Sequence, residues 1–472
     1  MRHLAHPIIA WLLLTGGAAV TAGEFPQVAE YRLDVRFDPD NSAMSGEAEV
    51  TFREDSEPSP TVTCFLHGEV MVDSVVQAGQ RLHFKQQKTY YDRDYTRIAD
   101  RVEISLVSVD PSEPITIWYD GFFHASRARS ESDFMRIDST GVYLRAYYYS
   151  PWFPFFVDPD QQPYNVSFSE VRIHVPPEMT CVFTGHLVSD EVVEGDRVSV
   201  WSGENINLAA AQCIAREFTT LKAGAVNVYC WPDDTSVAAG KKIVEFVSWI
   251  TGEYSKRYSH SAESSELHVM EMPEYGDISG GNVSGMISDS WLQFESETWP
   301  RRHLAHELVH PFVQVPVEQT DPIVAMDIEG FPTYFHLPVL EDLLGREWYV
   351  TFLTAREEGY LKMKETGLSR RGRRLPVEKP IDQILFDDIG EYKDLFIMCD
   401  RAPLFLNYLR EKMGGEQFGR FAGELCNLDK LTDQRFRDLV EKYLPGSRED
   451  VRLWLSTNEY PERFHLGNII GD

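Results

Sequence analysis

The chain has 472 residues, of which 43% are hydrophobic and 12% aromatic, a composition that excludes a disordered chain and predicts two or three globular domains. Its 74 acidic residues outnumber the 45 basic ones, and the formal net charge of −29 argues against nucleic acid as a partner because phosphates would be repelled. Such an excess of acidic groups is typical of a well-solvated surface.

The first 22 residues have the layout of a secretory signal peptide. Arg2 is their single formally charged residue, an apolar run covers Pro7 to Leu14, and small residues lead to Ala22. Since the apolar run is shorter than the ~20 residues that span a bilayer, cleavage after Ala22 is favoured over a retained anchor. We therefore expect residues 1–22 to be removed and the protein to be exported, periplasmic or secreted, without a stable membrane span. Export would permit disulfides among the six cysteines.

Residues 23–222 are predicted to form an all-β, sandwich-like domain. Segments 31–37 and 47–52 alternate polar and apolar residues with period two, as half-buried strands do. Two further short strands are predicted at 168–175 and 197–201, and turn residues such as proline, glycine and asparagine separate these runs, as in a sandwich of short strands.

The pattern changes near residue 223. A short apolar strand is predicted at 226–231, a helix with apolar residues at helical spacing at 236–258, and a second strand at 267–272 before a glycine-rich loop. Helices are predicted for the remainder of the chain, at 301–310, 322–334, 339–344, 346–362, 401–412, 416–426, 433–443 and 448–457. We therefore divide this part into a mixed domain, 223–345, and a helical lobe, 346–472.

The clearest chemical signal is the motif His306-Glu307-x-x-His310. On a helix, positions i and i+4 share a face, so the two imidazoles can bind one zinc ion. Glu307 lies beside the first ligand, where a carboxylate can accept a proton from water at the metal. Pro311 follows directly and is expected to end or kink this helix because it lacks an N–H group.

A catalytic zinc site needs a third protein ligand and one open position. Glu329 is the candidate: eighteen residues separate it from His310, enough for a turn and an antiparallel helix that return its carboxylate to the metal. Two histidines and a glutamate form a known catalytic zinc set. We therefore expect one Zn²⁺ per chain, held by His306, His310 and Glu329, with Glu307 as general base. The alternative is an amphipathic helix with two unrelated histidines, since a short motif also occurs by chance.

The motif and its surroundings resemble the M1 family of zinc aminopeptidases, in the gluzincin group. The two histidines, the eighteen-residue spacing and then Glu329-Gly330-Phe331 follow that family's pattern. Segment 279–287 stands where the family carries its substrate-binding GAMEN sequence, and 400–406 resembles the helix with the family's Lys-Gly-Ala. The likeness covers nearly the whole mature chain and corresponds to a short form of the family without further C-terminal domains.

The resemblance implies a multidomain fold, in which an N-terminal all-β domain precedes a thermolysin-like α+β zinc peptidase domain with a helical C-terminal lobe. It also implies a peptide substrate, held in part by Gly280, Gly281 and Asn282. In the family a glutamate of the GAMEN segment binds the substrate's α-amine, and the aligned residue here is Asn282. A neutral amide pairs more weakly with an ammonium group than a carboxylate does, which puts strict aminopeptidase action in doubt. Glu274 or Asp277 could substitute.

A second departure from the family concerns the oxyanion. The family places a tyrosine hydroxyl two residues before its Lys-Gly-Ala, and the aligned residue here is Met398, which has no proton to donate. Tyr392 would take that role if the helix register differs.

Three hypotheses follow from these matches and departures. The first is an active zinc metallopeptidase, and the retained base Glu307 favours it. The second is a zinc-containing binding protein of peptidase fold with weak or no catalysis, which Asn282 and Met398 favour. The third is zinc-dependent hydrolysis of a non-peptide substrate such as an epoxide.

Overall fold

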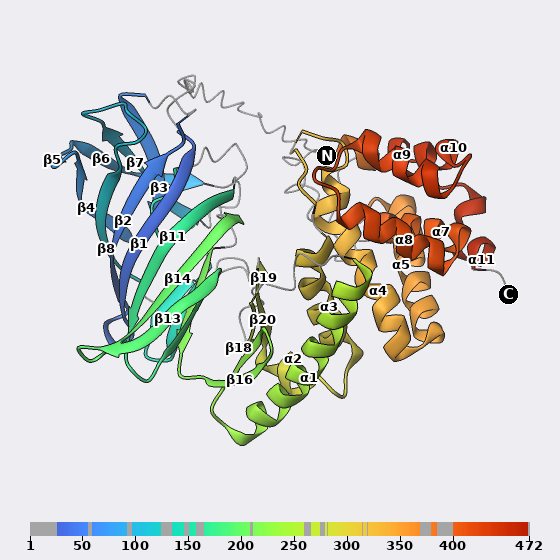
Figure 1. Cartoon of the computed structure of the whole chain (residues 1–472), viewed down its shortest axis with the longest axis horizontal. Helices are drawn as coiled ribbons and strands as arrows, with labels where there is room; N and C mark the ends of the chain where they lie inside the picture. Colours follow the sequence, from blue (N-terminus) through green and yellow to red (C-terminus); the bar gives the residue numbers. More distant parts are fainter. Residues whose placement is uncertain are drawn as a thin grey trace, which may run out of the picture.

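A β-rich N-terminal domain is followed by a mixed segment and a helical C-terminal part, as the sequence predicts. In Figure 1 the β domain lies on one side and the helices on the other, with a smaller sheet between them. The computed structural model describes residues 26–54, 59–91, 97–123, 135–145, 151–156, 165–207, 211–258, 266–273, 279–280, 282–313, 315–318, 320–368, 379–384 and 400–470. The predicted signal peptide lies outside these residues.

The largest sheet has eight strands, in the order β13-β14-β11-β1-β2-β8-β4-β5, and only β1 and β11 among these neighbours run parallel. On β1 every second side chain from Tyr31 to Phe37 is buried, so the predicted period-two pattern is confirmed. The strands are β1 (Val28–Asp38), β2 (Ala43–Phe52), β4 (Val70–Gln77), β5 (Gln80–Arg81), β8 (Ile115–Phe122), β11 (Asn165–Val175), β13 (His186–Val193) and β14 (Asp196–Asn207).

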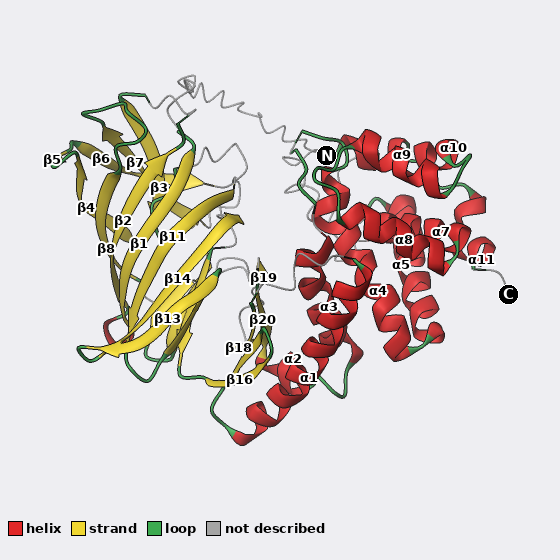
Figure 2. Cartoon of the chain, in the orientation of Figure 1, coloured by secondary structure: helices red, strands yellow, loops and turns green. Residues whose placement is uncertain are grey.

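Two smaller sheets complete the β domain, one in the order β12-β15-β10-β9 and one in the order β3-β7-β6. Figure 2 shows the strands of this domain on one side of the molecule and the helices on the other. A single hydrophobic core joins all three sheets, and Trp152, Phe153 and Trp201 are fully buried in it. The strands are β3 (Thr61–His67), β6 (Phe84–Tyr91), β7 (Arg97–Ser105), β9 (Met135–Asp138), β10 (Gly141–Arg145), β12 (Thr180–Phe183) and β15 (Gln212–Arg216).

The sheet between the two halves has five strands, in the order β16-β17-β18-β20-β19, and its three central strands are parallel. The strands are β16 (Thr219–Ala223), β17 (Val226–Cys230), β18 (Leu267–Met272), β19 (Ser279–Gly280) and β20 (Val283–Ile287). This sheet therefore begins at Thr219, a few residues before the boundary expected at 222.

Both faces of the five-stranded sheet are covered, which explains why every residue of β18 is buried, His268 and Glu271 included. Val269 faces the core that the sheet shares with helix α1 (Asp234–Arg257), whereas Met270 and Met272 join the core of the β domain. The sheet thus connects the β domain to the helical half.

Helices form most of the described chain after the five-stranded sheet, and most bounds lie within a few residues of the predicted ones. They are α2 (Ser288–Leu292), α3 (Thr298–Val313), α4 (Phe331–Leu344), α5 (Arg346–Thr366), α7 (Ala402–Met413), α8 (Gly415–Cys426), α9 (Asp433–Tyr443), α10 (Arg448–Ser456) and α11 (Leu466–Ile469), with a π-helix, η5 (Met326–Gly330), before α4 and short 3₁₀ turns at Pro39–Asn41, Ile381–Gln383 and Glu462–Phe464. A second hydrophobic core joins α1, α3, α4, α7 and α8.

Two helix bounds differ from the predicted ones, at 310 and between 334 and 339. Pro311 does not end α3, which continues to Val313, and Pro338 lies inside α4. A proline removes one backbone hydrogen bond from a helix. The side chains next to these prolines, Phe312 and Leu337 among them, are buried in the helical core, and their burial offsets that loss.

None of the helices in the described part of the chain combines the length and the apolar character that a membrane crossing requires. The cysteines in the described ranges are buried free thiols: Cys64, Cys181, Cys213, Cys230 and Cys426.

Candidate metal centre

The predicted ligands come together. The ligand atoms of His306, His310 and Glu329 all lie within 4.8 Å of one another, and all three side chains are half-buried. The Nε2 atom of His306 lies 3.4 Å from the Oε2 atom of Glu329. The two imidazole rings have centroids 5.0 Å apart and planes at 85°, so they approach the common point from different directions.

This donor set fits zinc. Zinc binds imidazole nitrogens and carboxylate oxygens at ~2.0–2.1 Å in tetrahedral sites, which places neighbouring donor atoms about 3.3 Å apart. The 3.4 Å between His306 and Glu329 matches that spacing. Three protein ligands also leave one position of a tetrahedral ion for water or substrate, as a catalytic zinc site requires.

Glu329 reaches the site through a π turn. It lies in η5, immediately before α4, and π turns inside helices are frequent at functional sites. Gly330 allows α7 to approach this turn closely. A Cβ atom at Gly330 would lie 2.9 Å from the sulfur of Met326 and 3.1 Å from the Cβ of Ala402. A glycine after the ligand therefore permits the packing that holds η5 in place.

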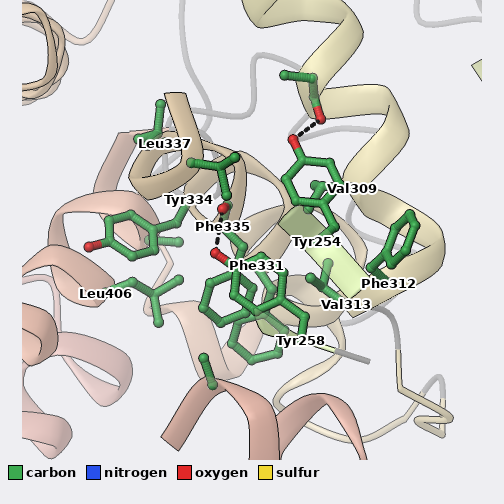
Figure 3. Close-up of a cluster of buried hydrophobic side chains, with 14 of the residues drawn as sticks. Tyr254, Tyr258, Val309, Phe312, Val313, Phe331, Tyr334, Phe335, Leu337 and Leu406 are labelled. Carbon is green, nitrogen blue, oxygen red and sulfur yellow. Dashed lines mark hydrogen bonds between the residues drawn. The ribbon is translucent and has the colours of Figure 1, made fainter. Parts of the chain in front are cut away.

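Two buried tyrosines connect the C-terminal end of α1 to α3, which carries two predicted ligands, and to α4, which follows Glu329 (Figure 3). The hydroxyl of Tyr254 donates to the carbonyl of Ala305 on α3 at 2.8 Å. The hydroxyl of Tyr258 donates to the carbonyl of Phe335 on α4 at 2.7 Å. Tyr254 lies in α1 and Tyr258 directly follows its last residue, so the C-terminal end of α1 is bonded to both α3 and α4.

Asp327 is a further support that the sequence analysis missed. Its Oδ1 atom accepts a hydrogen bond from the backbone N–H of Val315 at 2.9 Å, which ties the segment after α3 to η5. Burial raises the pKa of Asp327 to about 7. The available signal was an acidic residue within an otherwise apolar stretch.

Charges within the site act on the two histidines differently. Burial lowers the pKa of His306, but the hydrogen bond to Glu329 and the charges of Glu307 and Glu329 outweigh that effect and raise it. Burial dominates at His310 and lowers its pKa. The carboxylates therefore favour a positive charge at this point, and a bound cation would take the place of the proton on His306.

Two more histidines lie near the ligands and were not singled out from the sequence. His336 on α4 has its ring centroid 5.5 Å from that of His306, and its Nδ1 atom lies 2.8 Å from the carbonyl oxygen of Pro332. His303 on α3 has its Nδ1 atom 3.8 Å from the Oε1 atom of Glu307. The signal for His303 was its i, i+4 spacing from Glu307.

The side chain of Asn282 is bound by main-chain groups. Its amide nitrogen donates to the carbonyls of Gly185 at 2.7 Å and of Glu266 at 2.6 Å, and its oxygen accepts from the N–H of Gly185 at 3.1 Å. Since Gly185 belongs to the β domain, Asn282 links that domain to the turn before β20. These contacts give Asn282 a structural role, and the substrate-binding role of Gly280, Gly281 and Asn282 stays a prediction.

Several residues named from the sequence lie outside the described residues. They are Gly281, the alternative amine-binding acids Glu274 and Asp277, and the two oxyanion candidates Tyr392 and Met398.

No protein-family model matches the sequence, and no curated protein matches it. Among solved structures, the M1 zinc metallopeptidase from Deinococcus radiodurans is 18% identical, with 93% of this chain and 96% of that chain covered at a TM-score of 0.63. Yeast LTA4 hydrolase is 14% identical, with 93% and 69% covered at a TM-score of 0.67. Its complex with bestatin gives 14% identity, 95% and 72% coverage and a TM-score of 0.64. The chain therefore has the fold of the M1 zinc metallopeptidases.

Proposed function

We propose that this protein is a zinc metallopeptidase that hydrolyses peptide bonds, with one zinc ion held by His306, His310 and Glu329. The observation that carries the proposal is the meeting of these three ligand atoms within 4.8 Å. The fold supports it, because the solved structures with this fold include zinc metallopeptidases. Zinc bound there would supply Lewis-acid chemistry, polarising the scissile carbonyl and making water more acidic.

Glu307 is the general base of the proposed reaction. Its Oε1 atom lies 3.9 Å from the Nε2 atom of His306, so the carboxylate stands beside the ligand set rather than within it. From there it accepts the proton of the attacking water and then delivers it to the leaving amine.

A Glu307→Gln variant tests this proposal. Glutamine is nearly isosteric but does not accept the proton, so we expect zinc content to stay near one per chain while turnover of a peptide library falls at least ~10²-fold. Elemental analysis and fragment masses measure the two quantities. Glu416→Gln, at an exposed position of α8, is the matched control and should leave both unchanged. Full turnover in zinc-loaded Glu307→Gln would contradict the assigned base.

A second candidate, a zinc-containing binding protein of peptidase fold, is favoured by one observation. The polar atoms of Asn282 are held by main-chain groups, and no carboxylate stands at this position to bind a substrate amine. Matched free and N-acetylated peptides distinguish the candidates. Cleavage of free peptides alone would indicate that another acid binds the amine, cleavage of both would indicate a peptidase without that requirement, and zinc without cleavage of either would favour the binding protein.

The site of action is proposed to be outside the cytoplasm. Support comes from the single charge, short apolar run and small residues of the first 22 positions. The mature protein should then begin at Gly23, which N-terminal sequencing of protein from the native host would show. A mature chain that retains residues 1–22 would remove the proposal of export.

A further inference from the structure

Three residues of α3 form one row along the helix. Trp299, His303 and Glu307 follow one another at intervals of four residues, so their side chains lie on the same face. The metal ligand His306 belongs to the adjacent row, three residues after His303. The face that carries the proposed base therefore extends two turns towards the start of the helix.

The members of this row contact one another in sequence. The rings of Trp299 and His303 are stacked, with centroids 5.1 Å apart and planes at 3°. The Nδ1 atom of His303 then lies 3.8 Å from the Oε1 atom of Glu307. Exposure falls along the row, from 44% for Trp299 to 21% and 17% for the side chains of His303 and Glu307. The ring of His303 thus lies between the ring of Trp299 and the carboxylate of Glu307.

His303 is distinct from the ligand set. Within the described residues, the ligand atoms that gather are those of His306, His310 and Glu329. The 3.8 Å between His303 and Glu307 is longer than a direct hydrogen bond, but contacts of catalytic groups are often long without substrate and shorten when it binds. A small movement of either side chain would bring the imidazole N–H to the carboxylate.

We infer that His303 is a positioning residue for Glu307, and that Trp299 holds His303 in place by stacking. The inference rests on the proposed peptidase function. An N–H group beside the Oε1 atom would fix the rotamer of Glu307 and keep this oxygen next to the ligand set, since the same atom lies 3.9 Å from the Nε2 atom of His306. Misplacing a reacting group by about 1 Å can cost ~10²-fold in rate, so a loss of this contact should appear in kcat.

Three substitutions at His303 separate positioning from simple packing. His303→Phe keeps a ring to stack on Trp299 but has no N–H group, His303→Gln keeps an N–H donor without the ring, and His303→Ala keeps neither. We expect kcat to fall about tenfold in the Phe and Ala variants and by less than about threefold in the Gln variant. KM and zinc content should stay within about twofold of wild type, because His303 belongs to neither the ligand set nor the assigned substrate segment.

The matched control is His465→Ala. His465 also stacks on an aromatic ring, that of Tyr460 with centroids 5.1 Å apart, but it lies in the C-terminal segment and should leave kcat unchanged. Wild-type kcat in His303→Phe, a loss confined to KM, or a loss that follows zinc content would overturn the inference and leave the proposed function standing. If zinc-loaded wild-type protein cuts no peptide, both the inference on His303 and the proposed peptidase function would be overturned.

Discussion

The charged side chains of β1 are exposed to solvent, whereas those of the α3–η5 region are half-buried. Along β1 the apolar side chains face the core and the charged ones face solvent, where Arg32 and Glu170 form an ion pair at 3.1 Å with 56% and 30% of their side chains exposed. In the α3–η5 region, His306, Glu307 and Glu329 are half-buried, and carboxylate oxygens of Glu329 and Glu307 lie 3.4 and 3.9 Å from the Nε2 atom of His306. The α3–η5 region therefore places two carboxylates and an imidazole together where water is partly excluded.

The two regions also differ in how closely the backbone follows the local preferences of its residues. Strand β1 follows the period-two alternation of its residues, whereas the candidate site combines a proline inside α3, a π turn and the buried carboxyl of Asp327. Departures from local preference usually need support from the surrounding structure. Here Tyr254 of α1 and Tyr258, directly after α1, provide it through hydrogen bonds to α3 and α4. The difference indicates that the β domain is built for packing and the α3–η5 region for chemistry.

The largest expected effect is a loss of zinc affinity that leaves the β domain folded. Glu329→Ala removes one of three ligands, so zinc affinity should fall by more than the ~10–100-fold that loss of an outer partner costs. Competition with a chelator measures the affinity, and the exposed Glu416→Ala serves as control. The β domain shares no ligand, so its circular dichroism should not change. Zinc bound as tightly as in wild type would contradict the ligand set.

A core substitution in the β domain should lower the stability of the fold and leave zinc binding unchanged. Trp152 is fully buried, and its indole N–H donates to the carbonyl of Ala211 at 3.2 Å. Trp152→Ala should lower the free energy of unfolding by about 3–5 kcal/mol, the usual cost of removing a large aromatic side chain from a core. Phe122→Ala, at a position that is 54% exposed in the same domain, should change it by less than about 0.5 kcal/mol.

Denaturant unfolding measures both β-domain variants, and zinc per folded chain should match wild type in each. A loss of zinc in folded Trp152→Ala would show that the core of the β domain also sets the ligand geometry, and the contrast between the two regions would then fail.

The smallest effect concerns the junction between the regions and depends on pH. His268 of β18 packs edge-on against Trp201 of β14, with its Nδ1 atom 3.0 Å from the hydroxyl of Tyr229. Burial lowers the pKa of His268 to about 4, an effect that the charge of Glu266 only partly opposes. Between its ordinary pKa of ~6.5 and about 4 the unfolded chain therefore binds a proton that the folded chain does not.

The stability that His268 provides is thus present above pH 6.5 and is lost as the pH falls towards 4. Between pH 7.5 and 4.5 its share should be about 2 kcal/mol, at ~1.4 kcal/mol per pKa unit. Between pH 7.5 and 4.5 the free energy of unfolding should therefore fall less in His268→Gln than in wild type. Denaturant midpoints measured at both pH values would show this difference. His465→Gln is the control, and an equal loss in wild type and His268→Gln would exclude His268 as the cause.

The sequence alone determined the architecture and which three side chains meet at the candidate metal centre. Period-two alternation located β1 and β2, and helical spacing located α1. Two histidines one helical turn apart, together with Glu329, gave the three candidate ligands whose atoms lie together in the structure. These predictions succeeded because each depends on a pattern within a few residues, or on a spacing that the chemistry of one ion restricts to few solutions.

Only the tertiary structure decided the remainder. Helices α3 and α4 continue through Pro311 and Pro338 because their flanking side chains are buried in the helical core. Asn282 binds the backbone of Gly185, 97 residues away. The stacking of Trp299 on His303, and the position of His303 beside the half-buried Glu307, are likewise known only from the structure. In each case the deciding free energy comes from contacts between segments distant in sequence, and no local pattern records which segments will meet.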